Sequence, residues 1–385
     1  MISVTRIVAV SSKEWREIVR DRLFFSLAFI VPIMLMLLFG YGLSMDVEHI
    51  PFAIVDQDGS SMSRDYAYCF MSSRYFDFAG YLRNEREIGP LLTDNKIRAV
   101  IVIPEHFQKN LLTSHPAHVQ TIIDGTFPFR SQITKAYVTA INNAFSMELL
   151  VRHLSSVRGV PDSEAEQLME PVKLEIRYLY NQSVKSIWSI APNLLMVVLI
   201  MTTPFLTALG VVREKESGAI YNIYSSTVSR LEFLVGKLAP YMAISTMNAI
   251  VLWLLATTLF RAPFKGNIVF FFIVSLLYVI CTTGIGLVVS VFVRTQIAAM
   301  IVTTILTVLP SVLYSGLLIP VESLTKGSRI VAHMLPSMYY SNIVAGSFLK
   351  GIGPRVLWVD VVALAAYAII LFLAGYCLFT KRPSI

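Results

Sequence analysis

Six long apolar stretches constrain this chain more than any other feature of its sequence. A bilayer requires about 20 mostly apolar residues for each spanning helix, and six segments of the 385-residue chain meet that requirement. The predicted spans are residues 23–43, 187–212, 238–260, 268–293, 296–319 and 356–379. With 55% hydrophobic and 15% charged residues, the composition argues against a soluble protein. We therefore expect an α-helical polytopic membrane protein with six transmembrane helices.

The distribution of basic residues predicts how these spans are oriented. Lysine and arginine concentrate in the short cytoplasmic flanks of membrane proteins. If the N-terminus lies inside, twelve of these residues fall on cytoplasmic flanks and six on external ones. Both termini, including the tail at 380–385, are therefore expected in the cytoplasm, with residues 44–186 outside. The same rule explains the excess of 32 Lys and Arg over 25 Asp and Glu without a nucleic-acid partner.

Residues 1–22 precede the first span and have the pattern of an amphipathic helix. Apolar residues recur at helical spacing, and basic residues take other positions. Such a helix lies in the plane of the membrane interface. Trp15 is the expected interfacial anchor, with Arg16 and Arg20 near lipid phosphate. The first span ends without a small-residue cleavage site, so we expect it to remain as an uncleaved span.

Between the first two spans, the sequence has the pattern of a folded domain. Short β-branched runs predict strands at 51–56, 98–103 and 118–124. Helical candidates lie between and after them, near residues 61–71, 84–93, 104–112 and 129–157. This alternation predicts an extracytoplasmic α/β domain, residues 44–186, between transmembrane helices 1 and 2.

Motifs for nucleotide, metal or covalent chemistry are absent from the sequence. No G-x-x-x-x-G-K-[ST] phosphate loop occurs, and the histidines form no His-Glu-x-x-His pair. Asp56 and Asp58 belong to an Asp-Gln-Asp-Gly sequence, which favours a turn over a metal site. Cys69 stands alone in the polar segment and is expected to be a free or buried thiol. We expect no catalytic residue, bound cofactor or metal in this chain.

The longest internal loop, residues 213–237, begins with a run of charges directly after an uncharged span. The run consists of Arg213, Glu214, Lys215 and Glu216, and Gly218 follows it closely. These charges can extend the second span's helix beyond the membrane into water.

An apolar patch follows the charges in the same loop. Ile220, Ile223 and Tyr224 form one face at i, i+3 and i+4. Ser229 and Glu232 form a Ser-x-x-Glu capping box, which predicts a second helix running into the third span. Because the loop offers nothing to cover the apolar face, the face indicates contact with a partner protein or the membrane interface.

Polar residues inside the predicted spans are hydroxyls rather than charges. Ionisable residues inside a bilayer usually mark ion or proton paths, and the cores of the first five spans contain none. Threonines in the second and fifth spans can line a seam between helices or hydrogen-bond across it. The candidate substrate path or dimer seam comprises Thr202, Thr203, Thr207, Thr303, Thr304 and Thr307. Helix packing is the alternative role for each of them.

The segment VVREKESGAIYNIYSSTVSRLEFLVGK, residues 211–237, resembles the loop after the second span of ABC-2 type permeases, the membrane subunits of ATP-binding cassette exporters. The Arg-Glu-Lys-Glu run, the following glycine and the later Gly236-Lys237 carry the likeness. Tyr221 departs from it, because the family commonly has an acidic residue there. Residues 320–355 look like the family's hairpin of short external helices, and the subgroup with a large external domain includes multidrug-efflux permeases.

The resemblance implies partners and a site. Separate nucleotide-binding subunits would bind ATP and Mg²⁺, and a second permease, identical or related, would complete the membrane part in the cell's inner membrane. A periplasmic adaptor is a further expected partner where the cell has two membranes. The ATPase-coupling residues would be Arg213, Glu214, Lys215, Glu216, Gly218, Ile220, Tyr221, Ile223 and Tyr224.

The residues themselves lead to the same class by elimination. Without a phosphate loop or an intramembrane relay, energy must come from a partner. The resemblance then implies export of an amphiphilic or drug-like substrate from the cytoplasm or inner leaflet. A membrane-anchored sensor or assembly factor, which uses the external domain to bind a ligand or protein, is the alternative. Six spans with kinking prolines exceed what anchoring requires. The uncharged spans disfavour a secondary transporter.

Overall fold

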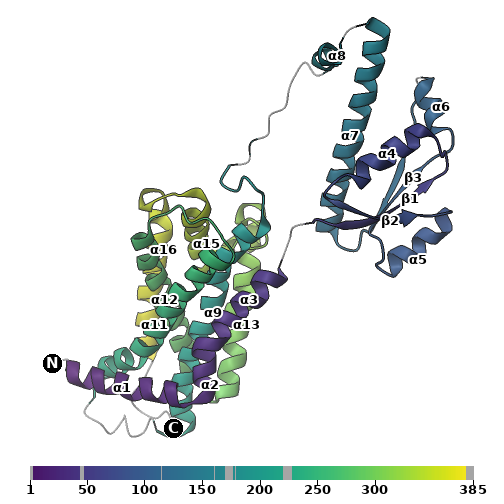
Figure 1. Cartoon of the computed structure of the whole chain (residues 1–385). Helices are drawn as coiled ribbons and strands as arrows, with labels where there is room; N and C mark the ends of the chain where they lie inside the picture. The colour runs from purple at the N-terminus through teal and green to yellow at the C-terminus, as the bar shows by residue number, and fades with distance from the viewer. Residues whose placement is uncertain are drawn as a thin grey trace. The chain divides into compact units, whose positions relative to one another are not determined.

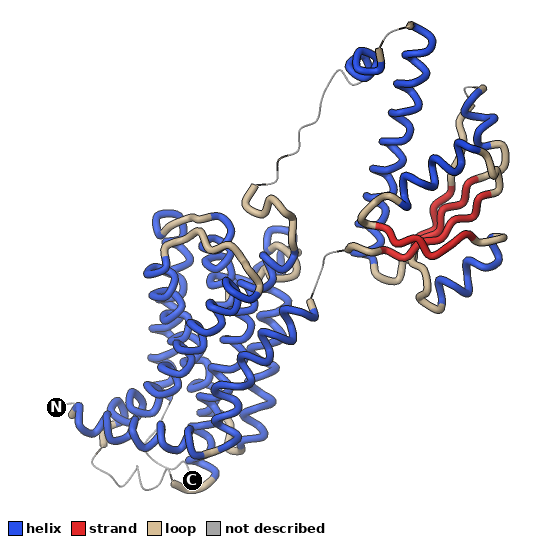
Figure 2. The backbone as a smooth tube through the Cα atoms, viewed as in Figure 1, coloured by secondary structure: helices blue, strands red, loops and turns tan. Residues whose placement is uncertain are grey.

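A computed structural model describes residues 3–43, 47–113, 115–159, 161–169, 177, 179–219 and 228–378. The chain divides into two compact units, one of Met1–Met45 with Tyr178–Ile385 and one of Asp46–Arg177. The first unit is helical, and the second contains the strands (Figure 2). The second unit is shorter than the predicted domain of residues 44–186, because residues 179–185 belong to the helical unit.

Six helices among the described residues are long and apolar enough to cross a membrane. The first joins α2 (Arg22–Phe25), η1 (Ser26–Ile30) and α3 (Val31–Gly42). The others are α9 (Ser186–Glu216), α11 (Arg230–Leu254) continued by η3 (Leu255–Leu259), α12 (Ile268–Phe292), α13 (Gln296–Tyr314) and α16 (Pro354–Leu378). Each overlaps one predicted span, so the prediction of a polytopic helical protein with six spans is confirmed.

Helix α9 lies at the centre of the helical unit. In its most apolar window 89% of the residues are buried, against 22% in α13 and 17% in α16. It packs against α3, α11, α12, α13 and α15 (Pro336–Ala345). This central position brings the end of α9 close to several other elements.

Shorter helices lie at the two ends of the bundle. Helix α1 (Val4–Arg20) crosses one end at a steep angle to the spans and packs on α11 (Figure 1). Residues 320–355, expected to hold short helices, form η4 (Val321–Ser323), α14 (Lys326–His333), α15 and η5 (Gly346–Lys350). Tyr340 and Ile343 of α15 are fully buried, so α15 is part of the packed bundle rather than a surface helix.

The α/β unit is built on a four-stranded sheet in the order β2-β1-β3-β4. The strands are β1 (Ile50–Asp56), β2 (Phe76–Tyr81), β3 (Ala99–Ile103) and β4 (Gln120–Ile123). Strands β2, β1 and β3 are parallel, and β4 is antiparallel to β3. The helices are α4 (Ser61–Met71), η2 (Glu85–Glu87), α5 (Ile88–Thr93), α6 (Phe107–Leu112), α7 (Pro128–Arg158) and α8 (Asp162–Met169).

Helices cover both faces of this sheet. Phe52 and Ile54 of β1 pack toward α4, α6 and α7, whereas Ala53 and Val55 pack toward α5, because successive strand residues point to opposite faces. Three strands were predicted from their β-branched runs, but β2 was not. Its sequence, Phe-Asp-Phe-Ala-Gly-Tyr, is mostly exposed at the sheet edge and lacks an apolar run.

Candidate functional site

The end of α9 carries four consecutive charged residues, 213–216, and each contacts a different part of the helical unit. The first, Arg213, forms an ion pair with Asp21 at the junction of α1 and α2 (Nη1 to Oδ2, 2.9 Å). Its guanidinium also lies over the ring of Phe24, 5.1 Å from the ring centroid. These contacts connect the end of α9 to the turn between α1 and the first span.

Lys215 and Glu216 contact the facing ends of α12 and α13. The Lys215 ammonium donates to the backbone carbonyls of Ser290 and Val291 in the last turn of α12. The Glu216 carboxylate accepts hydrogen bonds from the backbone N–H (3.1 Å) and side-chain amide (2.9 Å) of Gln296, the first residue of α13. A cation at a helix C-terminus and an anion at an N-terminus each complement the helix dipole. The two residues therefore link α9 to the turn between α12 and α13.

Glu214 belongs to a group of five side chains that we call the buried charge cluster. Its Oε1 lies 3.0 Å from the ammonium nitrogens of both Lys13 and Lys237. Lys237 Nζ is also 2.6 Å from Glu14 Oε2, and the Tyr241 hydroxyl donates to Glu14 Oε1. The cluster thus joins α1, which supplies Lys13 and Glu14, to α9 and to α11, which supplies Lys237 and Tyr241.

Burial makes the pairing within this cluster necessary. The side chains of Lys237, Glu14 and Glu214 are 1%, 3% and 6% exposed, and removing one partner of a buried ion pair costs about 3–5 kcal/mol. Burial raises the pKa of Glu14, and the charge of Lys237 and the hydrogen bonds from Lys237 and Tyr241 oppose that rise. For Lys13, burial lowers the pKa. The hydrogen bond to Glu214 and the negative charge of Glu214 outweigh burial, so the pKa of Lys13 is raised above its ordinary value. Lys13 therefore stays protonated at neutral pH.

Two glycines allow the helices of the cluster to approach. A Cβ atom at Gly236 would lie 2.8 Å from the backbone oxygen of Ile7 and 2.9 Å from Val10 Cβ, both in α1. A Cβ atom at Gly210 would lie 1.8 Å from the Tyr241 hydroxyl oxygen. Real Cβ atoms do not approach this closely, so Gly236 permits the crossing of α1 over α11 and Gly210 leaves room for the Tyr241 hydroxyl.

The start of α11 is also fixed to the start of α1. The predicted capping box is present: the Glu232 N–H donates to Ser229 Oγ (3.2 Å), and the Ser229 N–H donates to Glu232 Oε2 (2.7 Å). Glu232 Oε1 accepts a further hydrogen bond from the Ser3 N–H at 2.6 Å, and Arg6 lies 3.7 Å from its other oxygen. The loop before α11 therefore ends at a point anchored to α1.

Helix α1 has three distinct sides. Glu14 and Ile18 face the bundle and are buried. An exposed apolar side is formed by Val4, Val8, Trp15 and Val19. An exposed polar side is formed by Ser12, Lys13, Arg16 and Arg20. At 100° per residue, the exposed apolar side lies between the other two, an arrangement that fits a helix with protein, lipid and water around it. Membrane contact by Trp15, Arg16 and Arg20 stays a prediction.

The acidic residues of the helical unit do not form a convincing metal site. Carboxylate oxygens of Glu14, Glu17 and Glu214 lie within 4.8 Å of one another, but Lys13 and Lys237 supply ammonium groups among them. In the α/β unit, Asp56 Oδ1 accepts from the N–H groups of two of the next three residues, which forms the predicted turn. We assign no metal to either place.

The threonines predicted for a substrate path or dimer seam lie mostly inside the bundle. Five of the six are buried, namely Thr202, Thr203, Thr207, Thr303 and Thr307, and their helices α9 and α13 pack together. The hydroxyls of Thr207 and Thr307 donate to carbonyls one turn earlier. Those of Thr203 and Thr303 have no hydrogen-bond partner among the described residues. Thr304 is half-buried and its hydroxyl donates to the Met300 carbonyl (2.8 Å). A substrate role for the group stays a prediction.

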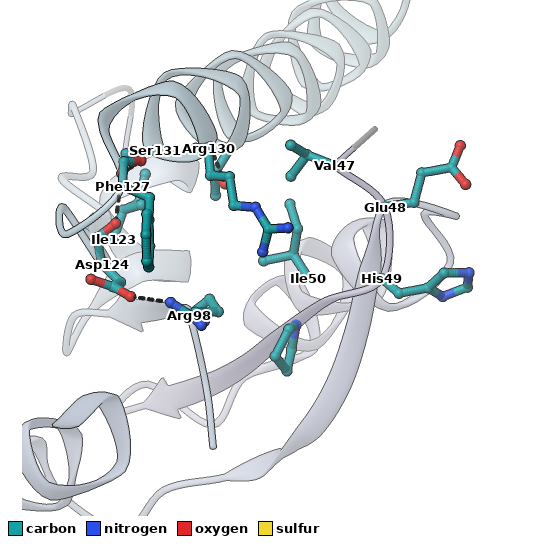
Figure 3. A pocket seen from close by; sticks show the side chains of 12 residues that line it. Val47, Glu48, His49, Ile50, Arg98, Ile123, Asp124, Phe127, Arg130 and Ser131 are labelled. Atoms are coloured by element: carbon teal, nitrogen blue, oxygen red, sulfur yellow. Dashed lines mark hydrogen bonds and ion pairs between the residues drawn. The ribbon is translucent and has the colours of Figure 1, made fainter. Parts of the chain in front are cut away.

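The α/β unit has a small cavity of about 120 Å³ at the starts of β1 and α7. Arg98 pairs with Asp124 beside it (2.6 Å), and Arg130 extends toward it from the first turn of α7 (Figure 3). Hydrogen bonds from Thr126, followed by that from Arg98, lower the pKa of Asp124 to about 2. This cavity is a candidate place for a ligand of the α/β unit.

The remaining predicted coupling residues follow the end of α9. Gly218 has φ of +73°, a left-handed conformation that favours glycine after a helix. Ile220, Tyr221, Ile223 and Tyr224 lie outside the described residues, so the apolar face predicted for them stays a prediction.

Comparison with known proteins identifies the family. A family model described as ABC-2 family transporter protein matches residues 22–377. The chain belongs to the ABC-2 transporter family.

Relatives that are similar over nearly the whole chain carry the names of ABC transporter proteins. It is 29% identical to the probable multidrug ABC transporter permease YbhS of Escherichia coli, over 99% of this chain and 98% of that protein. It is 24% identical to the probable multidrug ABC transporter permease YbhR of the same organism, over 92% of each. ABC transporter G family member 20 of Dictyostelium discoideum is 22% identical over 98% of this chain and 51% of that protein. The chain is therefore an ABC transporter permease and a multi-pass membrane protein.

Sequence reasoning found Glu214 in this permease but not the side chains that pair with it. Lys237 entered only as part of a family likeness, and Glu14 and Tyr241 were not singled out. A signal was present, because Glu14 lies four residues from both Val10 and Ile18 and so shares one helix face with two apolar residues. A charge at such a position indicates a buried partner.

Proposed function

We propose that this permease is the membrane subunit of an exporter that moves an amphiphilic or drug-like substrate out of the cytoplasm or the inner leaflet. ATP with Mg²⁺ is bound and hydrolysed on separate nucleotide-binding subunits. The family and the printed names of two relatives, probable multidrug ABC transporter permeases, support this class of function. The permease supplies the path and the mechanical connection to its partners.

One observation carries the coupling part of this proposal. Residues 213–216 at the end of α9 are tied by ion pairs and hydrogen bonds to α1, α11, α12 and α13. Charge-assisted hydrogen bonds are short and directional. A displacement of the loop that follows α9 would therefore be passed to all of these helices together. This supports a role for the loop as the contact with an ATPase.

The proposal also sets a topology and further partners. The α1 end of the bundle faces the cytoplasm, in agreement with the basic flanks of the spans, and the α/β unit is extracytoplasmic. A second permease, identical or related, packs against this one in the inner membrane. In a cell with two membranes, the α/β unit meets a periplasmic adaptor.

Reconstitution tests this function directly. The permease is co-purified with its nucleotide-binding subunits, and ATP turnover is measured in lipid vesicles. We expect the intact permease to change turnover severalfold, and the pair Glu214→Lys with Glu216→Lys to abolish that effect. Glu322→Lys, an exposed charge reversal in η4, is the matched control. Unchanged binding and turnover in the double variant would show that the α9 end does not couple to an ATPase.

The sensor or assembly-factor alternative is supported by the cavity beside Arg98 and Arg130. It predicts a permease that fails to co-purify with any ATPase, together with an α/β unit that is stabilised by a ligand. Under this alternative, Arg130→Ala would remove the stabilisation by the ligand. If the chain acts only in export, no such ligand stabilisation of the α/β unit is expected in either form.

A further inference from the structure

A groove of about 350 Å³ lies on α11, α12 and α16 in the membrane-spanning part of the permease. Its lining includes Leu238, Ala239 and Met242 of α11, Gly284 of α12 and Phe372 of α16. Along α11 these residues alternate with Lys237 and Tyr241 of the buried charge cluster. The groove is therefore at the same depth in the bundle as that cluster, on a different side of α11.

Small residues produce this groove. A Cβ atom at Gly284 would lie 2.9 Å from Leu371 Cβ, so α12 and α16 approach each other closely at this point. Ala239 contributes only a methyl group on the opposing helix. Met242 and Phe372 are half-buried at the margin, which places the opening on the outside of the helical unit.

The lining selects an apolar occupant. None of its residues is charged, and its one polar side chain, Thr283, is 1% exposed with a hydroxyl that has no hydrogen-bond partner among the described residues. Water is poorly held by such a surface, because a bound water needs two to four polar partners. An unfilled groove would lose the dispersion contacts of its lining atoms. The medium that faces a membrane span is lipid, whose flexible acyl chains meet both requirements.

We infer that this groove binds an acyl chain of a phospholipid from the leaflet on the α1 side of the membrane. The bound chain fills the space between α11 and the pair α12 and α16. Because Leu238 and Met242 each follow a cluster residue directly, about 100° around the helix, the lipid supports the side of α11 next to the one that faces the cluster. Under the function proposed above, lipid occupancy then keeps α11 in the position that the coupling contacts require.

A photoactivatable phospholipid tests the binding without ATP or partner subunits. The full permease is placed in vesicles of phosphatidylethanolamine and phosphatidylglycerol that contain a lipid with a diazirine near the end of one acyl chain. We expect peptides covering residues 235–242 and 280–284 to be labelled severalfold more than the exposed residues Ile369 and Ile370 of α16. Equal labelling of these peptides and that part of α16 would show only bulk lipid and would overturn the inference.

Matched substitutions complete the experiment. Ala239→Leu fills the groove and should reduce labelling of both peptides severalfold, whereas Ala366→Leu, at an exposed position of α16 outside the lining, should not. Thr283→Val removes the hydroxyl at nearly constant volume and should leave labelling unchanged. Loss of labelling in Thr283→Val would mean that a polar group is recognised, as for an exported substrate, and would contradict acyl-chain binding. Because this readout needs no ATPase, it can fail while the coupling function holds.

Discussion

Lys237 shows how a single residue can connect three helices. It lies in α11, is 1% exposed, and is within hydrogen-bond distance of Glu14 in α1 and Glu214 in α9. Lys237 is shared by both carboxylates. Without Lys237, Glu214 would keep only the half-exposed Lys13 as a cationic partner. Buried ions are stable only as members of such a network.

A double-mutant cycle measures the strength of this network. Lys237→Met is expected to lower the free energy of unfolding by about 3–5 kcal/mol, because it leaves the buried Glu14 without its cation. Glu14→Gln should cost less, because Lys237 keeps Glu214 as a partner. The double variant should cost clearly less than the sum, because it removes both members of the Glu14–Lys237 pair. Thermal unfolding of the purified permease in detergent provides the measurement.

The control for this cycle is Glu17→Gln. Glu17 pairs with Lys13 at 3.5 Å but is 38% exposed, so its loss should change stability by less than about 1 kcal/mol. Strictly additive effects of Glu14→Gln and Lys237→Met would mean that the two side chains do not interact in solution.

Asp124 gives the α/β unit a defined pH dependence. Hydrogen bonds from Thr126 and Arg98 lower its pKa from the ordinary 3.8 to about 2 in the folded protein. Because the folded pKa is depressed, the stabilisation is complete above about pH 4 and is lost as pH falls toward 2. Asp124→Asn should therefore lower the melting temperature at about pH 5 and have a smaller effect at about pH 3. An equal difference at both pH values would contradict this assignment, and Asp65→Asn, at an exposed position, serves as control.

At the scale of elements, α1 is positioned by contacts along its whole length. Ser3 and Arg6 contact Glu232 at the start of α11, Glu14 contacts Lys237 and Tyr241, and the turn after α1 contacts Arg213. A helix held only by membrane affinity would not need these specific partners. Helix α1 is therefore part of the rigid structure around the end of α9.

The capping box of α11 can be tested by a conservative substitution. Ser229→Ala removes one half of the capping box and should cost about 1 kcal/mol. The Glu232 carboxylate keeps its hydrogen bond from the residue 229 N–H, but the first turn of α11 that holds it against the Ser3 N–H is loosened, so proteolysis near the N-terminus should become faster. Ser12→Ala, at an exposed position of α1, should change neither. If both variants behaved alike, the box would contribute nothing measurable.

At the scale of the whole molecule, the exposed apolar sides of the spans are expected to be covered by different neighbours, either lipid or a second permease. Helix α13 presents a continuous apolar side that includes Ile301, Ile305 and Leu309, while its hydroxyls Thr303 and Thr307 face inward. Under the proposed function, a second permease covers this side of α13. Lipid alone would cover the exposed sides of α11 and α16.

Cysteine cross-linking in membranes tests this second permease. Cys69, Cys281 and Cys377 are first replaced by serine or alanine. Ile305→Cys, at a position 58% exposed in α13, is expected to form a cross-linked dimer with a short bifunctional reagent. Ile250→Cys, at a position 42% exposed in α11, should remain monomeric. Cross-linking at residue 250 but not at 305 would place the dimer contact elsewhere.

The sequence alone determined the class of this protein and most of its elements. Apolar stretches longer than a bilayer is thick can be satisfied only by spanning helices, so the six spans followed from composition and length. The capping box of α11 is likewise local, because Ser229 and Glu232 are only three residues apart. Strand β2 escaped prediction because its pairing at the sheet edge does not require an apolar sequence.

Only the tertiary structure decided what the charged run at residues 213–216 does inside the molecule. Its partners, Asp21, Lys13, Lys237, Ser290 and Gln296, come from five places along the chain. A charged residue in a sequence has no intrinsic partner, because its partner depends on which helices pack together and at what depth. The close crossing of α1 over Gly236 and the central position of α9 bring these groups within hydrogen-bond distance. The sequence shows that the charges exist, and the packing determines that they connect the helices.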